Sequence, residues 1–261
     1  EVREGYNEMP GGLAVVTGAS RGLGRELALA LDREGYRLQI CARRSKDLDS
    51  VGEQIAAQGR EAWSWNGDLT DSDCIEKLMG LLRPAPVEVL INNAAFTPSL
   101  KQMEEFTRGD FSETLTLNFG VPFLLMQAVI PGMKTRGSGT IVNICSLSGR
   151  RAIKNASLYS SSKFALRGLT EAVAQELEGT GVRCFSVSPG GMRTQMRQNL
   201  LGDADQQQDP GVVAHIIIEA IAGRIPVPQG ADLVVRGGAY TVVARERWTG
   251  LKMEHGQAAP V

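Results

Sequence analysis

The stretch Leu13–Gly24, LAVVTGASRGLG, decides the fold. Its first residues are apolar or β-branched and predict a strand over Leu13–Thr17, and the apolar spacing after the glycines predicts a helix over Gly22–Glu34. A glycine-rich turn between a strand and a helix lets the backbone approach a phosphate, which the helix N-terminus then faces. Because the Gly-x3-Gly-x-Gly spacing differs from the general dinucleotide fingerprint, a turn without a ligand is the alternative.

The same alternation of strands and helices continues along the chain. Runs rich in β-branched residues predict further strands at Arg37–Ala42, Ala62–Asn66, Val89–Asn92, Thr140–Ser146, Arg183–Ser188 and Asp232–Val235. Apolar residues at helical spacing predict further helices at Phe111–Met133, Leu158–Leu177 and Pro210–Ala222. Several strands are apolar on both faces, which favours central strands covered by helices on both sides. We therefore expect an α/β fold: a single-domain, Rossmann-type doubly wound parallel sheet of about seven strands flanked by helices.

No linker or shift in composition divides the chain. All 261 residues are therefore predicted to form one dinucleotide-binding and catalytic domain, with its core over 12–238. Residues 195–209 are rich in Gln and Asp and show little periodicity, which predicts a flexible surface segment, and residues 256–261 predict a loose C-terminal tail. Trp63 and Trp65 alternate along the third strand and are expected to pack on a face of the sheet.

Charge and hydropathy narrow the function classes. A formal net charge of -1 argues against binding to nucleic acid or anionic membranes, whose partners usually carry a basic excess. No apolar run reaches the ~18 residues of a membrane span, and the N-terminus has no signal-peptide core. We expect a cytoplasmic protein, with a removed organellar targeting segment as the alternative because the chain starts at Glu1.

The cysteines and histidines predict neither disulfides nor a metal site. Cys41, Cys145 and Cys184 lie in apolar strand-like runs, which is typical of reduced thiols in a core. His215 and His255 stand in no metal-ligand spacing with cysteines or carboxylates.

The residues after the second strand indicate which dinucleotide binds. NAD-binding proteins place a carboxylate there, which accepts hydrogen bonds from the ribose hydroxyls. This chain has Cys41-Ala42-Arg43-Arg44 instead. Guanidinium groups pair well with a 2′-phosphate, and Arg21 in the glycine turn is placed to contact the same group. We therefore predict NADP(H), the alternative being that Arg43 and Arg44 form a solvated surface.

Tyr159-Ser160-Ser161-Ser162-Lys163 places a phenol and an ammonium group where side chains are neighbours on one face of a helix. A free tyrosine has a pKa of about 10, and a close cation lowers that pKa because it favours the phenolate. Lys163 is therefore expected to tune Tyr159 for proton transfer near neutrality. The same spacing also arises by chance on helix surfaces, so its meaning depends on the rest of the sequence.

Further motifs follow the predicted strands in order. They are Asp68-Leu69, Asn92-Asn93-Ala94-Ala95, Asn118, Ser146 and Pro189–Thr194. Together with the glycine turn and Tyr159/Lys163, this series resembles the short-chain dehydrogenase/reductase family over roughly residues 13–235. The resemblance implies an NADP(H)-preferring carbonyl reductase that moves a hydride between nicotinamide and a ketone or secondary alcohol. The family usually has glycine where Ala95 stands, and Gly230–Gly238 matches the usual end of such chains only loosely.

The resemblance also implies roles for single residues. Tyr159 is the expected catalytic acid/base, Lys163 lowers its pKa and holds the nicotinamide ribose, Ser146 hydrogen-bonds the substrate oxygen, and Asn118 holds a relay water. Asp68 is expected to accept from the adenine amine, Asn92 and the backbone near Ala94 to line the adenosine ribose, and Thr194 to bind the carboxamide. The full cofactor set is Gly18, Ser20, Arg21, Gly22, Leu23, Gly24, Arg43, Arg44, Asp68, Leu69, Asn92, Ala94, Tyr159, Lys163, Pro189, Gly190, Met192 and Thr194.

These residues also have plain structural alternatives. Asn118 can serve as a polar contact inside a helix, Ser146 as a strand-end cap and Asp68 as a turn-former. The predicted substrate wall has core packing as an equal alternative; it comprises Phe96, Ser146, Leu147, Ile153, Met192 and Met196. Basic residues between Ser146 and Tyr159 suggest an anionic substrate or an acidic carrier protein, but a solvated loop is favoured; they are Arg150, Arg151 and Lys154.

The sequence also predicts an oligomeric state and leaves other functions open. The predicted helices Phe111–Met133 and Leu158–Leu177 carry small or apolar residues on more than one face, which together with the resemblance predicts a homodimer or homotetramer. Narrower enzymatic alternatives are a 3-oxoacyl-carrier-protein reductase and an NAD-linked alcohol dehydrogenase. The alternative from another class is a dinucleotide-binding sensor without catalysis.

Overall fold

The computed structural model describes residues 12–43, 46–201 and 207–245, and its central feature is one sheet in the strand order β3-β2-β1-β4-β5-β6-β7-β8. The strands are β1 (Leu13–Thr17), β2 (Arg37–Ala42), β3 (Ala62–Asn66), β4 (Val87–Asn92), β5 (Gly139–Ile144), β6 (Val182–Pro189), β7 (Asp232–Arg236) and β8 (Ala239–Val243). The helices are α1 (Gly22–Arg33), α2 (Lys46–Ala56), α3 (Ser72–Leu82), α4 (Arg108–Leu115), α5 (Val121–Arg136), α6 (Ser157–Glu176), α7 (Gln195–Leu201) and α8 (Pro210–Ile221). The predicted doubly wound, Rossmann-type sheet is confirmed.

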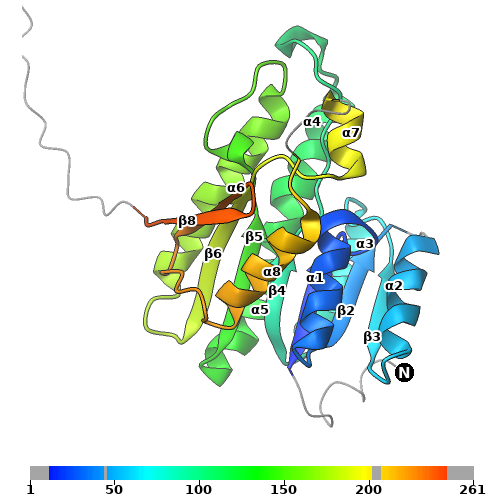
Figure 1. Cartoon of the computed structure of the whole chain (residues 1–261), viewed down its shortest axis with the longest axis vertical. Coiled ribbons are helices and arrows are strands. Elements are labelled where there is room, and N and C mark those ends of the chain that lie inside the picture. Colours follow the sequence, from blue (N-terminus) through cyan, green and yellow to red (C-terminus); the bar gives the residue numbers. More distant parts are fainter. Residues whose placement is uncertain (1–11, 44–45, 202–206, 246–261) are drawn as a thin grey trace, which may run out of the picture.

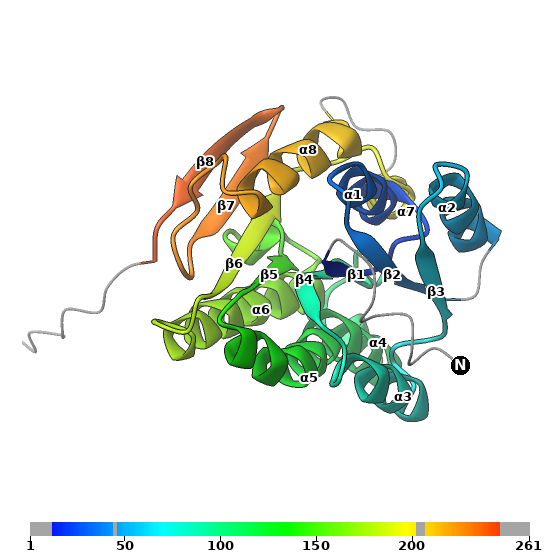
Figure 2. The same ribbon diagram turned by 90° about the horizontal axis from the view of Figure 1, so that it is seen from below.

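Helices cover both faces of this sheet. Figure 2 shows α1, α2 and α8 on one face and α3, α5 and α6 on the other. The pairs from β1 to β7 are parallel, so the carboxyl ends of seven strands meet at one edge. In Figure 1, α4 and α7 lie beyond the strands at the top of the molecule. This arrangement places the loops after the strands around one edge of the sheet, where open α/β folds bind ligands.

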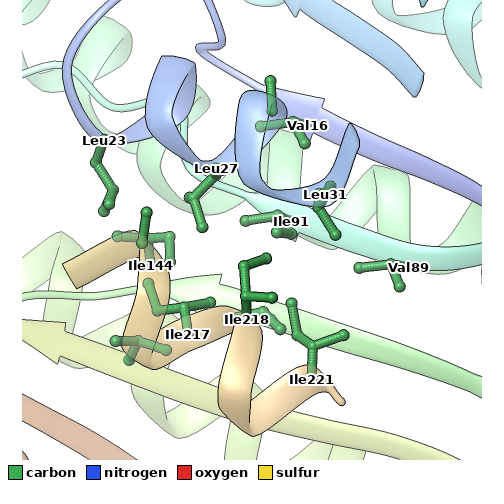
Figure 3. Packing of buried hydrophobic residues seen from close by; sticks show 14 of the residues in the cluster. Val16, Leu23, Leu27, Leu31, Val89, Ile91, Ile144, Ile217, Ile218 and Ile221 are labelled. Carbon is green, nitrogen blue, oxygen red and sulfur yellow. The ribbon is translucent and has the colours of Figure 1, made fainter. Parts of the chain in front are cut away.

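The apolar spacing of α1 fixes that helix on the sheet. Leu23, Leu27 and Leu31 are buried and recur every fourth residue, so they form one stripe. Figure 3 shows this stripe facing Ile217, Ile218 and Ile221 of α8, with strand residues beneath it. Burying one such side chain stabilises the fold by about 1.5–3 kcal/mol, so the stripe holds the N-terminus of α1 at the sheet edge.

The structure differs from the sequence-based expectations in having an additional strand at one edge of the sheet and additional helices on its faces. The sheet continues past residue 238, because Gly237 and Gly238 have φ of +59° and +77° and turn the chain back into the antiparallel strand β8. Such a turn is easy for glycine and joins neighbouring strands in two residues. Helices α2 and α3 were also not predicted individually. Helix α7 was not predicted either, and the remaining helices agree with the predicted ranges to within a few residues, apart from a break in the long one.

That break lies between α4 and α5. The predicted helix Phe111–Met133 runs instead from Arg108 to Arg136 and contains a wide π-type turn at Thr116–Gly120. Among the described residues it is the one helix long and apolar enough to cross a membrane by composition, but 39% of its apolar window is buried within the fold. Core helices meet the same criterion, and Leu125, Met126 and Met133 pack into the core.

The predicted flexible segment 195–209 contains regular structure at both ends. It begins with α7, and the buried Gln208 pairs with Met192 in a β-bridge, whose backbone hydrogen bonds join Gln208 to Gly191 and Arg193. Residues 202–206, the tail 256–261 and Arg44 lie outside the described residues. Cys41, Cys145 and Cys184 are buried as free thiols, as predicted. Trp63 and Trp65 pack against the core on one face of the sheet, also as predicted.

Candidate active site

The glycine turn after β1 requires its glycines for steric reasons. Gly18 has φ of +68°, and a Cβ on it would lie 2.9 Å from the Cα of Ala94. A Cβ on Gly24 would lie 2.1 Å from the carbonyl oxygen of Gly18, closer than atoms can pack. The start of α1 therefore lies directly against the end of β1. The turn between them stays at the surface of the molecule, where Arg21 is exposed.

Thr17 and Asn93 lock this turn to the end of β4, and neither was predicted as a site residue. The Thr17 hydroxyl accepts the backbone N–H groups of Asn93 and Ala94, both at 3.0 Å. The Asn93 Nδ2 donates to the Thr17 carbonyl at 2.8 Å. The signal was present in the sequence, because Asn93 stands next to Asn92 in the motif, but the spacing did not tell which amide faces the turn.

The N-terminus of α1 is suited to an anion. Arg21 is the N-cap residue, it makes no side-chain capping bond, and the first turn of the helix has no acidic residue. The positive end of the helix dipole and unsatisfied N–H groups favour a phosphate at such a place. Arg21 and Arg43 are both exposed, and Ser20 and Gly22 are partly buried between them and the helix. These residues fit an anionic dinucleotide.

Asp68 is exposed, with its carboxylate held by the residues that follow it. It accepts the backbone N–H of Thr70 at 2.9 Å and the Thr70 hydroxyl at 2.7 Å. The backbone hydrogen bond is the main cause that lowers the pKa of Asp68, and nearby Arg43 adds to it. The turn-forming alternative is therefore seen in the structure, and the second carboxylate oxygen remains for a ligand.

Asn92 differs from its expected role at the adenosine ribose. Its side chain is 2% exposed, and its Nδ2 donates to Asn143 Oδ1 at 2.8 Å inside the fold. The structure therefore places the Ala94 backbone, but not the Asn92 side chain, next to the glycine turn. The cause is the alternation of side chains along β4, which turns Asn92 inward and Asn93 toward the glycine turn.

The remaining predicted cofactor residues lie around the same edge. Leu23 and Leu69 are buried, and so is Pro189 at the end of β6. The Gly190 N–H donates to the Val235 carbonyl at 2.8 Å, which ties the loop after β6 to β7. Thr194 lies across the glycine turn, since its Cγ2 is 3.2 Å from the position of a Cβ on Gly22. Met192 is partly buried against the core.

Asn118 lies inside the π-type turn and is fully buried. Its Oδ1 accepts the Phe96 N–H at 2.7 Å, and its Nδ2 donates to the Phe96 carbonyl at 2.8 Å and to Ser162 Oγ at 2.9 Å. The Ser162 hydroxyl donates to the Tyr159 carbonyl at 2.7 Å. Asn118 thus joins the loop after β4 to the backbone of the Tyr159 turn, with Ser162 as a link that sequence reasoning missed.

Tyr159 and Ser146 face each other through their hydroxyl groups. Burial raises the pKa of Tyr159 above its ordinary value, and interaction with the Ser146 hydroxyl partly offsets this effect. The Ser146 Oγ also accepts the Ser148 N–H at 3.1 Å. Ser146 therefore also caps a short turn, as its structural alternative predicted.

Lys163 is buried behind this pair. Its side chain is 2% exposed, its Nζ donates to the Ile144 carbonyl at 2.8 Å, and the Nζ lies 5.9 Å from the centre of the Tyr159 ring. Burial lowers the pKa of Lys163 to about 8. Burial also raises the pKa of Tyr159, so the net direction of its shift is opposite to the expected one, while the contribution of Lys163 to that pKa stays a prediction.

The predicted substrate wall is only partly assembled around Tyr159 and Ser146. Phe96, Leu147 and Met192 are half-buried in the loops after β4, β5 and β6, and Met196 is half-buried in α7. Ile153 is 43% exposed and lines a cavity of about 720 Å³ together with Phe164 and Lys154. None of the four catalytic candidates lines that cavity. It opens on another face of α6 than Tyr159, so we do not assign it to the reaction.

The basic loop before α6 is divided in two. Arg150 is bound to Asp232 at 2.7 Å, whereas Arg151 and Lys154 are exposed. The prediction that Arg150 meets an acidic carrier or solvent is therefore wrong, because a buried carboxylate holds its guanidinium. Within the described residues, no group of His, Cys, Asp or Glu side chains could hold a metal ion.

A family model described as short chain dehydrogenase matches residues 12–205. The chain belongs to the short-chain dehydrogenase family. A gluconate 5-dehydrogenase of Gluconobacter oxydans is 34% identical over 204 residues, which cover 76% of this chain and 77% of the relative. A 3-oxoacyl-acyl-carrier-protein reductase of Staphylococcus epidermidis is 32% identical over 242 residues, covering 87% and 98%.

Solved structures agree with this assignment. A short-chain dehydrogenase from Sphingobium yanoikuyae, in complex with NADPH, superposes with a TM-score of 0.77 at 26% identity and covers 82% of this chain and 85% of its own. The predicted family resemblance is therefore confirmed. As a short-chain dehydrogenase, the chain is an oxidoreductase that acts on CH–OH or C=O groups.

Proposed function

We propose that this short-chain dehydrogenase transfers a hydride between NADP(H) and a ketone or secondary alcohol, with Tyr159 as the general acid/base. The observation that carries the proposal is the grouping of three side chains: the Ser146 hydroxyl is close enough to affect the pKa of the Tyr159 phenol, and the buried Lys163 amine lies 5.9 Å from the centre of the Tyr159 ring. Two hydroxyl donors at one point suit a carbonyl oxygen on which negative charge develops.

In the direction of reduction, bound NADPH supplies the hydride to the carbonyl carbon. The Ser146 hydroxyl then donates a hydrogen bond to the substrate oxygen, and the Tyr159 hydroxyl gives that oxygen its proton. Burial keeps Tyr159 protonated at neutral pH, which is the form that an acid needs. Lys163, charged below a pKa of about 8, lies close enough to favour the phenolate that remains.

The cofactor choice rests on charge at the ribose end. Arg43 follows β2 where a carboxylate would bind the ribose of NAD, and Arg21 is exposed at the start of α1. Two guanidinium groups on this surface favour a 2′-phosphate. The NADPH complex of the Sphingobium relative supports the same choice. NADPH pools are usually kept reduced, so we propose carbonyl reduction as the direction.

The apolar residues around the site favour a hydrophobic ketone, with Phe96, Leu147, Met192 and Met196 as its wall. The Staphylococcus relative is named for a 3-oxoacyl group and the Gluconobacter relative for gluconate, so both thioester and sugar-acid ketones belong in the test. Arg151 and Lys154 remain exposed for an anionic substrate or carrier.

The proposal is tested by NADPH oxidation at 340 nm against a panel of ketones, diketones, quinones, acetoacetyl thioesters and keto-gluconates. The same panel is run with NADH and with Tyr159→Phe. Turnover with NADPH that disappears in Tyr159→Phe supports the proposal. Equal turnover by Tyr159→Phe contradicts the mechanism, and tight NADPH binding without turnover favours the sensor function.

We also propose a cytoplasmic homo-oligomer. The aromatic side chains Phe111, Phe123 and Phe164 are 54%, 44% and 38% exposed on α4, α5 and α6. Large apolar side chains exposed on neighbouring helices are typical of a surface that another subunit covers. Size-exclusion chromatography with light scattering at micromolar concentration is expected to give a dimer or tetramer. A monodisperse monomer contradicts this.

A further inference from the structure

A buried carboxylate lies behind the turn that carries Ser146. Asp232, the first residue of β7, is 4% exposed. Its Oδ1 accepts the hydroxyls of Ser186 at 2.7 Å and Ser188 at 3.0 Å, both from β6, and its Oδ2 accepts Arg150 Nη1 at 2.7 Å. A buried charge is costly without such partners, so all these contacts depend on one another.

Arg150 and Ser146 are the two ends of one short turn, Leu147–Gly149. The Ser148 N–H donates to Ser146 Oγ at 3.1 Å, and the Arg150 N–H donates to the Leu147 carbonyl at 3.0 Å. A guanidinium held at one end of so short a hydrogen-bonded turn therefore fixes the hydroxyl at the other end.

The same turn is confined on its opposite side by α6. A Cβ on Gly149 would lie 2.8 Å from the carbonyl carbon of Lys163, so the turn packs directly on the backbone of that residue. β7 holds one side through Asp232, and α6 holds the other. The distance between Ser146 and Tyr159 is thus set by two elements that are far apart in the sequence.

We propose that the Arg150–Asp232 ion pair is a positioning pair that holds the Ser146 hydroxyl in place for the reaction. The inference rests on the proposed function, in which Ser146 donates to the substrate oxygen. The Arg150 guanidinium is bound to Asp232, so its proposed effect on the reaction passes through the turn. Small displacements of a catalytic donor reduce turnover strongly because hydrogen bonds to the reacting oxygen depend steeply on geometry.

The kinetic test is a double-mutant cycle with Arg150→Met and Ser146→Ala, using the best ketone from the panel. Arg150→Met is expected to lower kcat about tenfold and to leave the KM for NADPH unchanged. In the Ser146→Ala background, Arg150→Met is expected to cost nothing further, because the group that it positions is gone. An equal loss in both backgrounds overturns the proposal.

A second measurement needs no substrate. Hydrogen exchange followed by mass spectrometry on the NADPH-bound protein is expected to show faster exchange of peptides covering residues 146–151 in Arg150→Met. Asp232→Asn keeps the shape and the serine contacts but removes the charge, and is expected to show the same change. Exchange equal to wild type in both variants overturns the proposal, even where one of them folds poorly.

The matched control is Arg60→Met. Arg60 pairs with the buried Asp32 at 2.9 Å, with similar burial of the carboxylate but away from the site. It is expected to lose stability without a change in kcat or in exchange at 146–151. If Ser146→Ala and Tyr159→Phe themselves keep full turnover, the proposed function fails, whereas the exchange measurement still decides whether the ion pair holds the turn.

Discussion

The two halves of the sheet hold their functional edges in different ways. In the half from β1 to β4, the edge is built by backbone contacts: the glycine turn packs on Ala94, and Thr17 binds two backbone N–H groups. Its charged groups, Arg21, Arg43 and Asp68, remain exposed. This half therefore presents a rigid backbone and exposed charged side chains to a ligand that arrives from solution.

In the half from β5 to β8, the edge is built by buried polar side chains. Lys163 and Asp232 are 2% and 4% exposed, and each has hydrogen-bond partners inside the fold. Proton transfer benefits from such a dry, fixed environment, where charges interact more strongly than in water. Substitutions in the first half should therefore change cofactor affinity, and those in the second half turnover and pH dependence.

The largest expected effect is on turnover in the second half. Tyr159→Phe removes the proton donor and should lower kcat by roughly 10²–10⁴-fold. The NADPH Kd, measured by fluorescence titration, should change less than about twofold, because the phenol adds little to binding energy. A loss of NADPH affinity that matches the loss of kcat would contradict the assignment of cofactor binding to the first half and proton transfer to the second.

Lys163→Met should stabilise the protein while it lowers activity. The pKa of Lys163 is lowered from 10.5 to about 8, so the folded state disfavours the charged amine below pH 8, at a cost of about 3 kcal/mol. The variant should therefore be more stable than wild type at pH 7 by up to that amount. As the pH rises from about 8 through 10.5, the unfolded state also loses its proton, and the gain should disappear.

Urea unfolding at pH 7 and pH 10 measures the stability difference for Lys163→Met. Lys77→Met, at an exposed position on α3, is the matched control, because it should show no such pH dependence. A variant of Lys163 that is less stable than wild type at both pH values would mean that its bond to Ile144 outweighs the cost of burial.

Arg43→Glu tests the first half. Replacing the guanidinium by a carboxylate should raise the KM for NADPH about 10–100-fold, because charge-assisted hydrogen bonds to phosphate are worth about 1.5–3 kcal/mol. The KM for NADH should stay the same or fall, and kcat should be unchanged. Arg33→Glu, exposed at the end of α1, serves as control. A parallel rise for both cofactors would argue against a 2′-phosphate contact.

The smallest expected effect comes from Thr17→Val. Thr17 is 1% exposed, and valine keeps its shape but cannot accept the N–H groups of Asn93 and Ala94. The NADPH Kd should rise a few-fold. The free energy of unfolding should fall by about 1–3 kcal/mol, because buried donors lose their acceptor. Thr140→Val, at the opposite edge of the sheet, should not change the NADPH Kd. Unchanged NADPH affinity in Thr17→Val would mean that the glycine turn binds the cofactor without the hydrogen bonds of the Thr17 hydroxyl.

The sequence by itself determined the order and type of most elements. The ranges Leu13–Thr17, Arg37–Ala42 and Ala62–Asn66 are the same in prediction and structure. Strand and helix periods and glycine turns are local properties, so they can be read without knowing the neighbours. The resemblance to the short-chain dehydrogenase/reductase family also predicted one site for Ser146, which follows β5, and for Tyr159 and Lys163, which lie on one face of α6.

The tertiary structure alone decided the burial of those residues, their hydrogen-bond and ion-pair partners, and their pKa values. The neighbours Asn92 and Asn93 differ in whether they face the core or the glycine turn, and Arg150 meets Asp232 across 82 residues of chain. Burial also reversed the expected pKa shift of Tyr159. Each of these outcomes depends on which distant atoms surround a side chain, because desolvation and pairing energies arise from neighbours that local spacing does not specify.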